Sequence, residues 1–302
     1  MKIAVIGIGA MGSYYAAKLS KNNDVLAFEH FENKIEKVNK EGINLIEDSV
    51  TSNYKVKCFK DGEYKMPVNL ILCCVKSTQT LNAIEQNKEL IDSNTIVITM
   101  QNGLGNVKDI SRYVDESNIV VGASKLNLVN QDDNTIKVLG NGLTYVGSVT
   151  NDMKDVLIVK TVFDKAGFKC EATKDINTLV WDKLILNSVT NPLCALFKCK
   201  IRVIYENKNI WNIAEGLVEE ATKVAKCANV SLDKEVVLEE LRKKVYDMGA
   251  GYPSMYQDIN NNRITEIERL NGAIINVAYK NKIEVPYNEF IVNAIKAIEK
   301  LY

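Results

Sequence analysis

The sequence predicts two domains: an α/β domain built on a doubly wound parallel sheet, followed by an all-helical domain. Three observations support this prediction. A glycine-rich turn follows the first apolar run, strand and helix patterns alternate through the first half, and only helical spacing remains in the second half. At 302 residues the chain is long for one domain and natural for two. We expect the first domain to span residues 1–174 and the second residues 175–302.

The glycine-rich turn lies between a predicted strand and a predicted helix. The apolar run Ile3–Ile6 precedes it, and the turn itself comprises Gly7, Ile8, Gly9, Ala10, Met11 and Gly12. Here the first glycine allows a sharp turn, the second lets phosphates approach the main chain, and the third lets the helix lie close to its strand. Bare N–H groups and the positive end of the helix dipole then face a pyrophosphate. The spacing predicts a Rossmann-like dinucleotide site, and a glycine-rich loop without a ligand is the alternative.

Strand and helix patterns alternate after this turn. Strands are expected at Lys2–Ile6, Val25–Phe28, Tyr54–Phe59, Asn69–Val75, Thr95–Met100 and Ile119–Val121. Helices are expected between several of them, at Glu32–Asn39, Thr78–Leu90 and Leu104–Tyr113. This alternation predicts a parallel sheet covered by helices on both faces. From Ser124 to Gly147, short strands broken by turns predict hairpins at the far edge of the sheet, the turns being Asp132-Asp133 and Asn141-Gly142.

The last elements complete the first domain and build the second. A helix at Asp152–Lys165 and a strand at Phe168–Ala172 end the α/β pattern. Apolar residues then recur at helical spacing in six segments: Ile176–Phe197, Trp211–Cys227, Lys234–Tyr246, Ser254–Asn260, Thr265–Asn281 and Asn288–Leu301. We expect the two domains to pack together with a substrate cleft between them.

Composition excludes several classes of function. Lys+Arg and Asp+Glu balance at 38 each, so no net field favours a nucleic acid or an anionic membrane. The apolar runs are of strand length, and nothing at the start resembles a cleavable signal. Seven cysteines without a CxxC motif indicate reduced thiols and a cytoplasmic protein. The single histidine, His30, excludes a multi-histidine zinc site, and we expect no bound metal.

One polar stripe stands out in the second half. Lys183, Asn187 and Asn191 recur at i, i+4 and i+8 and therefore share one face of an otherwise apolar helix. Pro192 removes a helical N–H donor beside Asn191 and is expected to bend the helix there. The stripe must face water, a partner helix or a polar ligand, and two amides in place of better helix formers favour the ligand.

Four other residues are candidates for the site. Ser254 begins one predicted helix and Glu266 follows Thr265 at the start of another, where ordinary capping is the alternative explanation. Lys76 and Asn102 follow two predicted parallel strands, at the edge of the sheet where α/β proteins bind ligands. Asn102 lies in an Asn-Gly pair, so a plain turn is its alternative.

Taken together, these motifs resemble the ketopantoate reductase family. The set is the glycine turn, Val-Lys-Ser, Gln-Asn-Gly-Leu-Gly, the stripe helix from Trp181 through Asn-Pro-Leu, Pro-Ser-Met-x-Gln-Asp, and Thr-Glu-Ile near an Asn-Gly. The resemblance implies reduction of 2-dehydropantoate to pantoate, towards pantothenate and coenzyme A. It implies Lys183 as the general acid, with Glu266 placing the lysine and the substrate. It also implies that Asn187, Asn191, Ser254 and Asn102 bind the substrate, and that Lys76 and Asn102 serve the cofactor.

The expected cofactor depends on the end of the second strand. Family members usually carry an arginine there that pairs with the 2′-phosphate of NADP(H). This chain has Glu29-His30, and a carboxylate accepts hydrogen bonds from a free ribose 2′-OH and repels a phosphate. Glu29 therefore favours NAD(H), with Lys34 as the nearby cation that could admit NADP(H). Departures at Cys199–Arg202 and at Gly251 leave a related 2-oxo acid open as the substrate.

The chemistry of reduction fits these residues. A ketone oxygen that gains negative charge needs a proton, and a lysine whose pKa is lowered by burial can supply it. Two alternatives remain: a 3-hydroxyacid or opine-type oxidoreductase, and a non-catalytic dinucleotide-sensing protein. The expected partner is a small-molecule 2-oxo acid, and the sequence leaves open whether the chain forms a homodimer.

Overall fold

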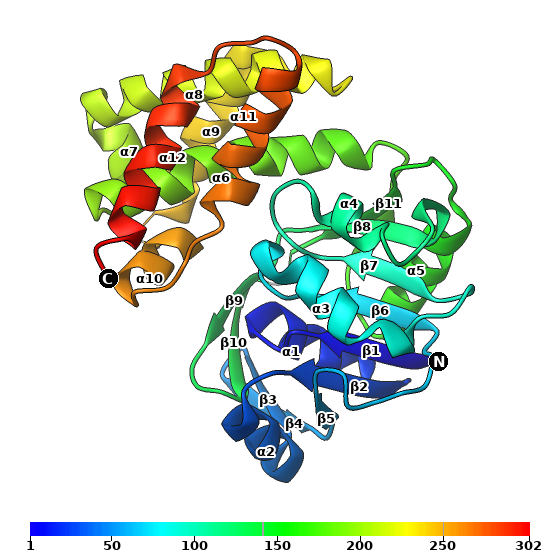
Figure 1. Cartoon of the computed structure of the whole chain (residues 1–302). Coiled ribbons are helices and arrows are strands. Elements are labelled where there is room, and N and C mark those ends of the chain that lie inside the picture. Colours follow the sequence, from blue (N-terminus) through cyan, green and yellow to red (C-terminus); the bar gives the residue numbers. More distant parts are fainter. Residues whose placement is uncertain (141, 250) are drawn as a thin grey trace. The chain divides into compact units, whose positions relative to one another are not determined.

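The computed structural model describes residues 1–140, 142–249 and 251–302 (Figure 1). The predicted Asn141-Gly142 turn thus falls partly outside the described residues. The chain forms two compact units. The first comprises residues 1–101 and 106–176, and the second comprises residues 102–105 and 177–302.

An eight-stranded sheet forms the centre of the first unit. Its order is β12-β11-β8-β7-β6-β1-β2-β5, and all neighbouring pairs are parallel except β11 with β8. The strands are β1 (Lys2–Ile6), β2 (Asp24–Glu29), β5 (Lys57–Lys60), β6 (Leu70–Cys73), β7 (Ile96–Thr99), β8 (Ile119–Ser124), β11 (Thr144–Ser148) and β12 (Cys170–Ala172). The run β5-β2-β1-β6-β7-β8 reverses direction at β1, as in a doubly wound nucleotide-binding sheet. The predicted α/β class is confirmed.

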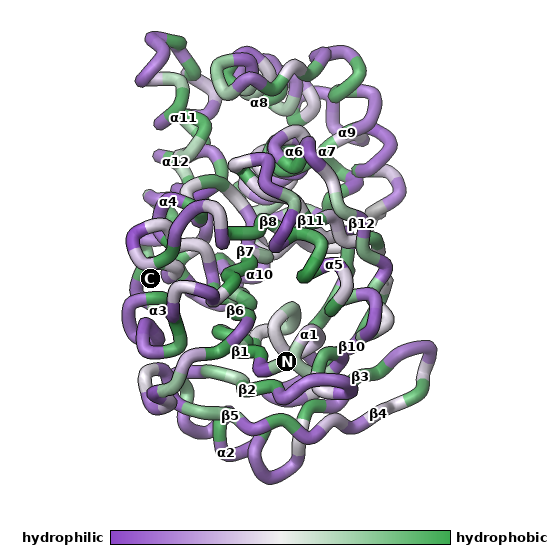
Figure 2. The backbone as a smooth tube through the Cα atoms, turned by 90° about the vertical axis from the view of Figure 1, so that its right-hand side faces the viewer, coloured by the Kyte–Doolittle hydropathy of each residue, from purple (hydrophilic) through white to green (hydrophobic). Residues whose placement is uncertain are grey.

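Both faces of this sheet are buried because its side chains alternate between two cores. Ile3 and Val5 of β1 pack with side chains of α1 (Ala10–Leu19) and α5 (Lys154–Lys165). Their neighbours Ala4 and Ile6 pack on the opposite face, with side chains from α3 (Thr80–Gln86) and α4 (Asn106–Ile110). Figure 2 shows β6 and β7 as hydrophobic strands, in contrast to the hydrophilic α2 (Glu32–Glu41). The prediction of helices on both faces is confirmed.

A second sheet of four strands corrects the sequence-based prediction. Its order is β4-β3-β10-β9, formed by β3 (Ile43–Glu47), β4 (Val50–Tyr54), β9 (Asn127–Asn130) and β10 (Thr135–Gly140). The predicted strand Tyr54–Phe59 is therefore wrong at its start, because Tyr54 ends β4 and only residues 57–59 belong to β5 of the main sheet. The hairpin expected after Ser124 exists as β9 and β10, yet it joins β3 and not the edge of the main sheet. Local pattern predicted the turns but could not assign the partner strand.

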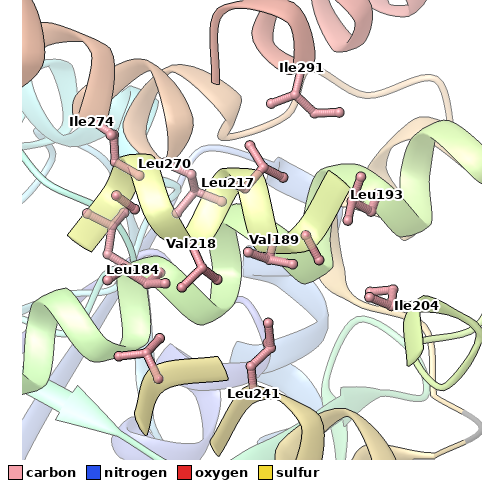
Figure 3. Close-up of a cluster of buried hydrophobic side chains, with 14 of the residues drawn as sticks. Leu184, Val189, Leu193, Ile204, Leu217, Val218, Leu241, Leu270, Ile274 and Ile291 are labelled. Atoms are coloured by element: carbon pink, nitrogen blue, oxygen red, sulfur yellow. The ribbon is translucent and has the colours of Figure 1, made fainter. Parts of the chain in front are cut away.

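The second unit is helical and is built around one long helix. α6 (Ile176–Phe197) carries apolar side chains that pack against α8 (Lys208–Cys227), α9 (Lys234–Met248) and α11 (Asn271–Lys280). Figure 3 shows Leu184, Val189 and Leu193 of α6 among side chains of these neighbours. The remaining helices are α7 (Val203–Glu206), α10 (Ser254–Asn260) and α12 (Pro286–Glu299). The prediction of a helical second half is confirmed.

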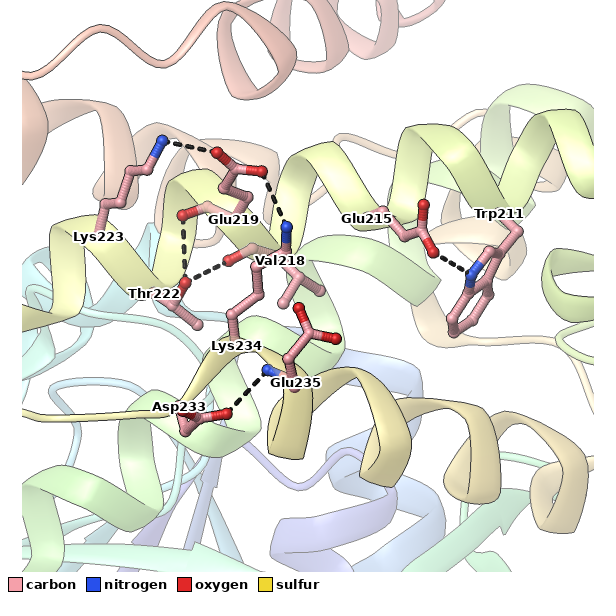
Figure 4. Close-up of polar contacts among 9 residues, drawn as sticks. All are labelled: Trp211, Glu215, Val218, Glu219, Thr222, Lys223, Asp233, Lys234 and Glu235. Carbon is pink, nitrogen blue, oxygen red and sulfur yellow. Dashed lines mark hydrogen bonds and ion pairs between the residues drawn. The ribbon is translucent and has the colours of Figure 1, made fainter.

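Side-chain caps define where two of these helices begin. Asn207 accepts hydrogen bonds from the N–H groups of residues 209 and 210 at the start of α8, and Asp233 does the same for residues 235 and 236 of α9. Glu219 of α8 pairs with Lys223 and with Lys234 of α9 (Figure 4). The predicted helix Thr265–Asn281 is divided, since a short 3₁₀ turn (η4, Ile267–Arg269) precedes α11.

Three properties of the chain bear on its chemistry. All seven cysteines are free thiols. No helix in the described residues is long and apolar enough to cross a membrane. Within the same residues, no cluster of three or more His, Cys, Asp or Glu side chains could hold a metal ion.

Candidate active site

The glycine turn has the geometry that a pyrophosphate needs. Gly7 has φ +85°, and a Cβ there would lie 2.8 Å from the main-chain nitrogen of Val75. A Cβ on Gly12 would lie 2.0 Å from the carbonyl oxygen of Gly7, so the start of α1 approaches the turn as closely as a glycine allows. A Cβ on Gly9 would meet nothing within 4 Å. Gly9 thus borders open space beside the N-terminus of α1, where Ile8, Ala10 and Met11 complete the turn.

Glu29 is the last residue of β2 and lies at the same end of the sheet as the glycine turn. Its side chain is only 7% exposed, and its Oε1 accepts a hydrogen bond of 2.9 Å from the N–H of His30. Oε1 also lies 2.9 Å from Nδ1 of His30, and Oε2 lies 3.7 Å from Nζ of Lys34. Glu32, in contrast, is exposed and pairs with Lys60. The Glu29 carboxylate therefore has a lysine in its immediate neighbourhood, Lys34.

Two loops follow neighbouring strands beside the glycine turn. Lys76 comes after β6, half-buried, directly before a short 3₁₀ turn. Gln101 comes after β7 and joins the two loops, because its Nε2 donates to the carbonyl oxygen of Val75 at 2.9 Å and to Oγ1 of Thr80 at 2.8 Å. This role of Gln101 was not predicted from the sequence. The signal available was its position at the carboxyl end of a buried parallel strand.

Asn102 belongs to a segment that packs with the helical unit. Leu104 donates its N–H to the carbonyl oxygen of Arg269 at 3.1 Å, and its side chain packs on the core around α6. A Cβ on Gly103 would lie 2.2 Å from the same carbonyl oxygen, which explains the glycine and its φ of +81°. This hydrogen bond connects the loop that carries Asn102 to Arg269, which lies three residues after Glu266 in the chain.

Lys183 lies on α6, and its pKa is well below the ordinary value for a lysine. The two residues before it have other partners. Trp181 packs in the core, and Oδ2 of Asp182 lies 3.0 Å from Nζ of Lys244 of α9. Lys183 itself is half-buried. Burial lowers the pKa of Lys183 from 10.5 to about 8, against the opposing effect of the Glu266 carboxylate, which raises it. Desolvation of the cation thus outweighs the nearby anion.

Glu266 is held by the residues on either side of it. The N–H of Thr265 donates to Oε1 of Glu299 at 2.7 Å, and Oγ1 of Thr265 accepts from the N–H of Ile267 at 3.2 Å. Glu266 occupies the N-cap position of η4 and is half-buried. The N–H of Ile267 is thus capped by Thr265, and the carboxylate of Glu266 raises the pKa of Lys183.

Asn191 and Ser254 lie side by side. Oδ1 of Asn191 accepts from Oγ of Ser254 and from the N–H of Met255, both at 3.1 Å. The alternative explanation of Ser254 as an N-cap is wrong, since Pro253 holds the cap position and Ser254 is the first residue of α10. The amide of Asn191 satisfies the start of α10 instead. Because two donors fix Oδ1, the Nδ2 group of Asn191 is the end that remains to donate.

The polar stripe lies on α6 as the spacing predicts. The helix is continuous from Ile176 through Pro192 to Phe197, with Asn187 half-buried between Lys183 and the buried Asn191. None of the three side chains is exposed, which disfavours a simple solvated stripe. A cation of lowered pKa, a carboxylate acting on it, and amide donors along one helix form a set that can hold and protonate a small polar oxo compound.

Family models match nearly the whole chain. Residues 3–151 match the model described as ketopantoate reductase PanE/ApbA, and residues 175–299 match the model of its C-terminal part. The 2-dehydropantoate 2-reductase of Pyrococcus horikoshii is 30% identical over 302 residues, covering 100% of this chain and 98% of that protein. The enzyme of the same name from Lactococcus lactis is 27% identical, covering 100% and 99%.

Solved structures agree with these sequence matches. A ternary complex of D-mandelate dehydrogenase with NADH and anilino(oxo)acetate has a TM-score of 0.94 at 25% identity, covering 99% of both chains. The 2-dehydropantoate 2-reductase of Geobacter metallireducens has a TM-score of 0.91 at 24% identity, covering 98% and 99%, and supports the fold. The chain therefore belongs to the ketopantoate reductase family of oxidoreductases.

Proposed function

We propose that the protein reduces 2-dehydropantoate to pantoate, a step towards pantothenate and coenzyme A, with a nicotinamide dinucleotide as reductant. The observation that carries the proposal is Lys183, a half-buried lysine whose pKa is lowered to about 8 beside the Glu266 carboxylate. Perturbed acid–base groups of this kind are concentrated at catalytic sites. Relatives of full length that carry the name 2-dehydropantoate 2-reductase support the substrate.

Lys183 acts as the general acid in this proposal. A bound nicotinamide dinucleotide supplies the hydride. As negative charge builds on the ketone oxygen, the ammonium of Lys183 stabilises it and donates the proton. Because its pKa is about 8, the amine is mainly protonated at neutral pH and yields its proton more readily than an ordinary lysine. Glu266 opposes the loss of that proton and so keeps the acid form populated.

Neutral amide and hydroxyl groups hold the substrate in this proposal. Nδ2 of Asn191 and the amide of Asn187 follow Lys183 on the same helix face, and the hydroxyl of Ser254 adjoins Asn191. We assign the two amides to the carboxylate and hydroxyl oxygens of the oxo acid. The oxygen of Ser254, whose proton goes to Asn191, accepts from the substrate hydroxyl. Asn102 is assigned to both substrate and cofactor. Amide and hydroxyl groups bind these oxygens without adding charge that would lower the pKa of Lys183 further.

The first unit holds the cofactor in this proposal. The open space at Gly9 and the close approach at Gly12 suit a pyrophosphate at the N-terminus of α1, and Lys76 lies in an adjoining strand-end loop. Glu29 is buried at the end of β2, where a carboxylate accepts from a ribose 2′-OH. We therefore propose a preference for NADH over NADPH, although Lys34 at 3.7 Å partly offsets the charge of Glu29.

A related 2-oxo acid is the second candidate substrate. The favouring observation is the likeness to D-mandelate dehydrogenase, whose complex holds NADH and anilino(oxo)acetate. Lys183 could protonate any 2-oxo acid in the same way. The two candidates therefore share a reaction class and differ only in the substituent of the substrate that the protein prefers.

A substrate panel tests the proposal. Oxidation of NADH and of NADPH is followed with 2-dehydropantoate, pyruvate, 2-oxoisovalerate and phenylglyoxylate. We expect the highest kcat/KM with 2-dehydropantoate and NADH. A higher value with phenylglyoxylate would favour the second candidate. Dinucleotide binding without turnover of any oxo acid would contradict both and indicate a sensor.

A further inference from the structure

Pro192 leaves a main-chain acceptor without its helical donor. In an α-helix the N–H of residue i donates to the carbonyl of residue i−4, and proline has no N–H. α6 continues unbroken through Pro192, so the carbonyl oxygen of Ser188 lacks that bond. Ser188 is completely buried, where water cannot replace the donor. This carbonyl lies between Asn187 and Asn191, the two asparagines of the polar stripe.

Asn271 supplies the missing donor. Nδ2 of Asn271, the first residue of α11, donates to the carbonyl oxygen of Ser188 at 2.9 Å. Asn271 is itself 0% exposed. The bond therefore joins α6 at its proline to the start of the helix that follows Glu266 and η4.

A chain of buried hydrogen bonds fixes the direction of this donor. Glu220 of α8 accepts from the N–H groups of Tyr287 and Asn288 at the start of α12, and its Oε2 also accepts from Nδ2 of Asn288 at 2.7 Å. Oδ1 of Asn288 must then face Asn271, whose Nδ2 donates to it at 3.0 Å. Within the described residues Oδ1 of Asn271 is without a partner, so every fixed contact uses its NH₂ end. Because a carboxylate can only accept hydrogen bonds, Glu220 fixes the orientation of the Asn288 amide, which in turn fixes that of Asn271.

We propose that Asn271 is a positioning residue for the reaction, because it replaces the helical donor that Pro192 lacks and holds the Asn187–Asn191 turn in register with Glu266. The positioning role for substrate rests on the proposed function. The hydrogen-bond replacement does not, because it follows from Pro192 and the Ser188 carbonyl alone. Asn271 touches no reacting atom in this proposal. Its effect passes through the main chain of α6.

A double-mutant cycle between positions 192 and 271 tests the proposal. Pro192→Ala returns an N–H to the helix, which can then bond the Ser188 carbonyl without Asn271. We expect Asn271→Ala to lower the melting temperature by about 3–8 °C when residue 192 is proline, and by less than half as much when it is alanine. Asn276→Ala, an exposed change on the same helix, is the matched control and should alter nothing. Equal losses in both backgrounds would overturn the proposal.

Steady-state kinetics give the second measurement. We expect Asn271→Ala to raise KM for the oxo acid about tenfold, with KM for the dinucleotide unchanged, and Pro192→Ala to suppress most of that rise. A role in packing alone predicts no such suppression, so an equal rise in both backgrounds would refute the positioning role. If wild-type protein reduces no oxo acid, the proposed function fails while the melting cycle still decides the hydrogen-bond replacement.

The milder substitution Asn271→Ser covers the case in which alanine prevents folding. If Asn271→Ala does not fold with proline at 192, folding of the double mutant supports the proposal. If neither folds, the cycle is repeated with Asn271→Ser. A smaller loss of melting temperature with alanine at 192 then supports the proposal, and equal losses overturn it.

Discussion

The glycine turn of the α/β unit presents mainly main-chain groups, whereas the stripe helix of the helical unit presents side chains. The turn consists of six consecutive residues, and its three glycines matter because they carry no side chain. The stripe helix uses side chains, and its partners Ser254 and Glu266 come from distant segments. A local sequence motif can therefore specify the glycine turn, whereas tertiary burial sets the pKa of Lys183 on the stripe helix. Substitutions in both regions test this contrast, from the largest expected effect to the smallest.

Removing the amine of Lys183 should have the largest effect. We expect Lys183→Met to lower kcat by roughly 10²–10⁴-fold, because both the proton donor and the charge beside the ketone oxygen are lost. Steady-state kinetics measure this effect, and the exposed Lys280→Met is the matched control. Turnover near the wild-type value would remove Lys183 from the mechanism.

The same variant should be more stable than wild type at neutral pH. The folded-state pKa of Lys183 is about 8, below its ordinary value of 10.5, so the unfolded chain binds more protons between these values. Wild-type stability therefore rises with pH through that window, and the burial penalty is fully present below pH 8. We expect Lys183→Met to gain on the order of 1–3 kcal/mol at pH 7 and to lose this pH dependence, as measured by denaturant unfolding. Unchanged stability would contradict the burial of the charge.

Two alanine substitutions in the glycine turn should separate folding from binding. Gly12→Ala places a Cβ 2.0 Å from the Gly7 carbonyl and should lower the free energy of unfolding by about 1–3 kcal/mol or more. Gly9→Ala places its Cβ in open space and should leave stability nearly unchanged while weakening dinucleotide binding more than tenfold. Thermal unfolding and fluorescence titration with NADH measure the two effects. Normal binding by Gly9→Ala would mean that the phosphates do not approach there.

Glu29 should set the choice of dinucleotide. We expect Glu29→Gln to shift the ratio of kcat/KM for NADH over NADPH by about 10–100-fold towards NADPH, because a charged acceptor for the 2′-OH is lost and Lys34 is released from it. Glu32→Gln, which disturbs only an exposed pair with Lys60, is the control. A strong NADPH preference in wild-type protein would refute this assignment.

Glu266 should tune Lys183, with the smallest effect at neutral pH. The carboxylate raises the pKa of Lys183, so Glu266→Gln should move the alkaline decline of kcat/KM to below pH 8. The pH–rate profile of the reduction measures this shift. Glu268→Gln, an exposed carboxylate two residues away, should leave the profile unchanged. A shift towards higher pH would contradict the sign of the interaction.

The two sheets show where prediction of the fold from sequence succeeded and where it failed. Strands β1, β6 and β7 were predicted because a strand buried on both faces is a continuous apolar run. β3 was missed, and β4 was merged with β5, because their pattern is partly exposed and carries no such signal. The hairpin of β9 and β10 was found from its turn, but its partner β3 lies far away in the chain. Register between distant strands is not encoded in a local window.

The sequence by itself determined the glycine turn, the α/β and helical halves, and the stripe of Lys183, Asn187 and Asn191 on one helix face. These features follow from steric requirements and from periodicity, which act over a few residues. Only the tertiary structure decided that Lys183 has a pKa of about 8, that Oδ1 of Asn191 is taken by the start of α10, and that Asn271 replaces the donor missing at Pro192. Desolvation and hydrogen-bond direction depend on groups brought together from remote segments, and no local pattern contains them.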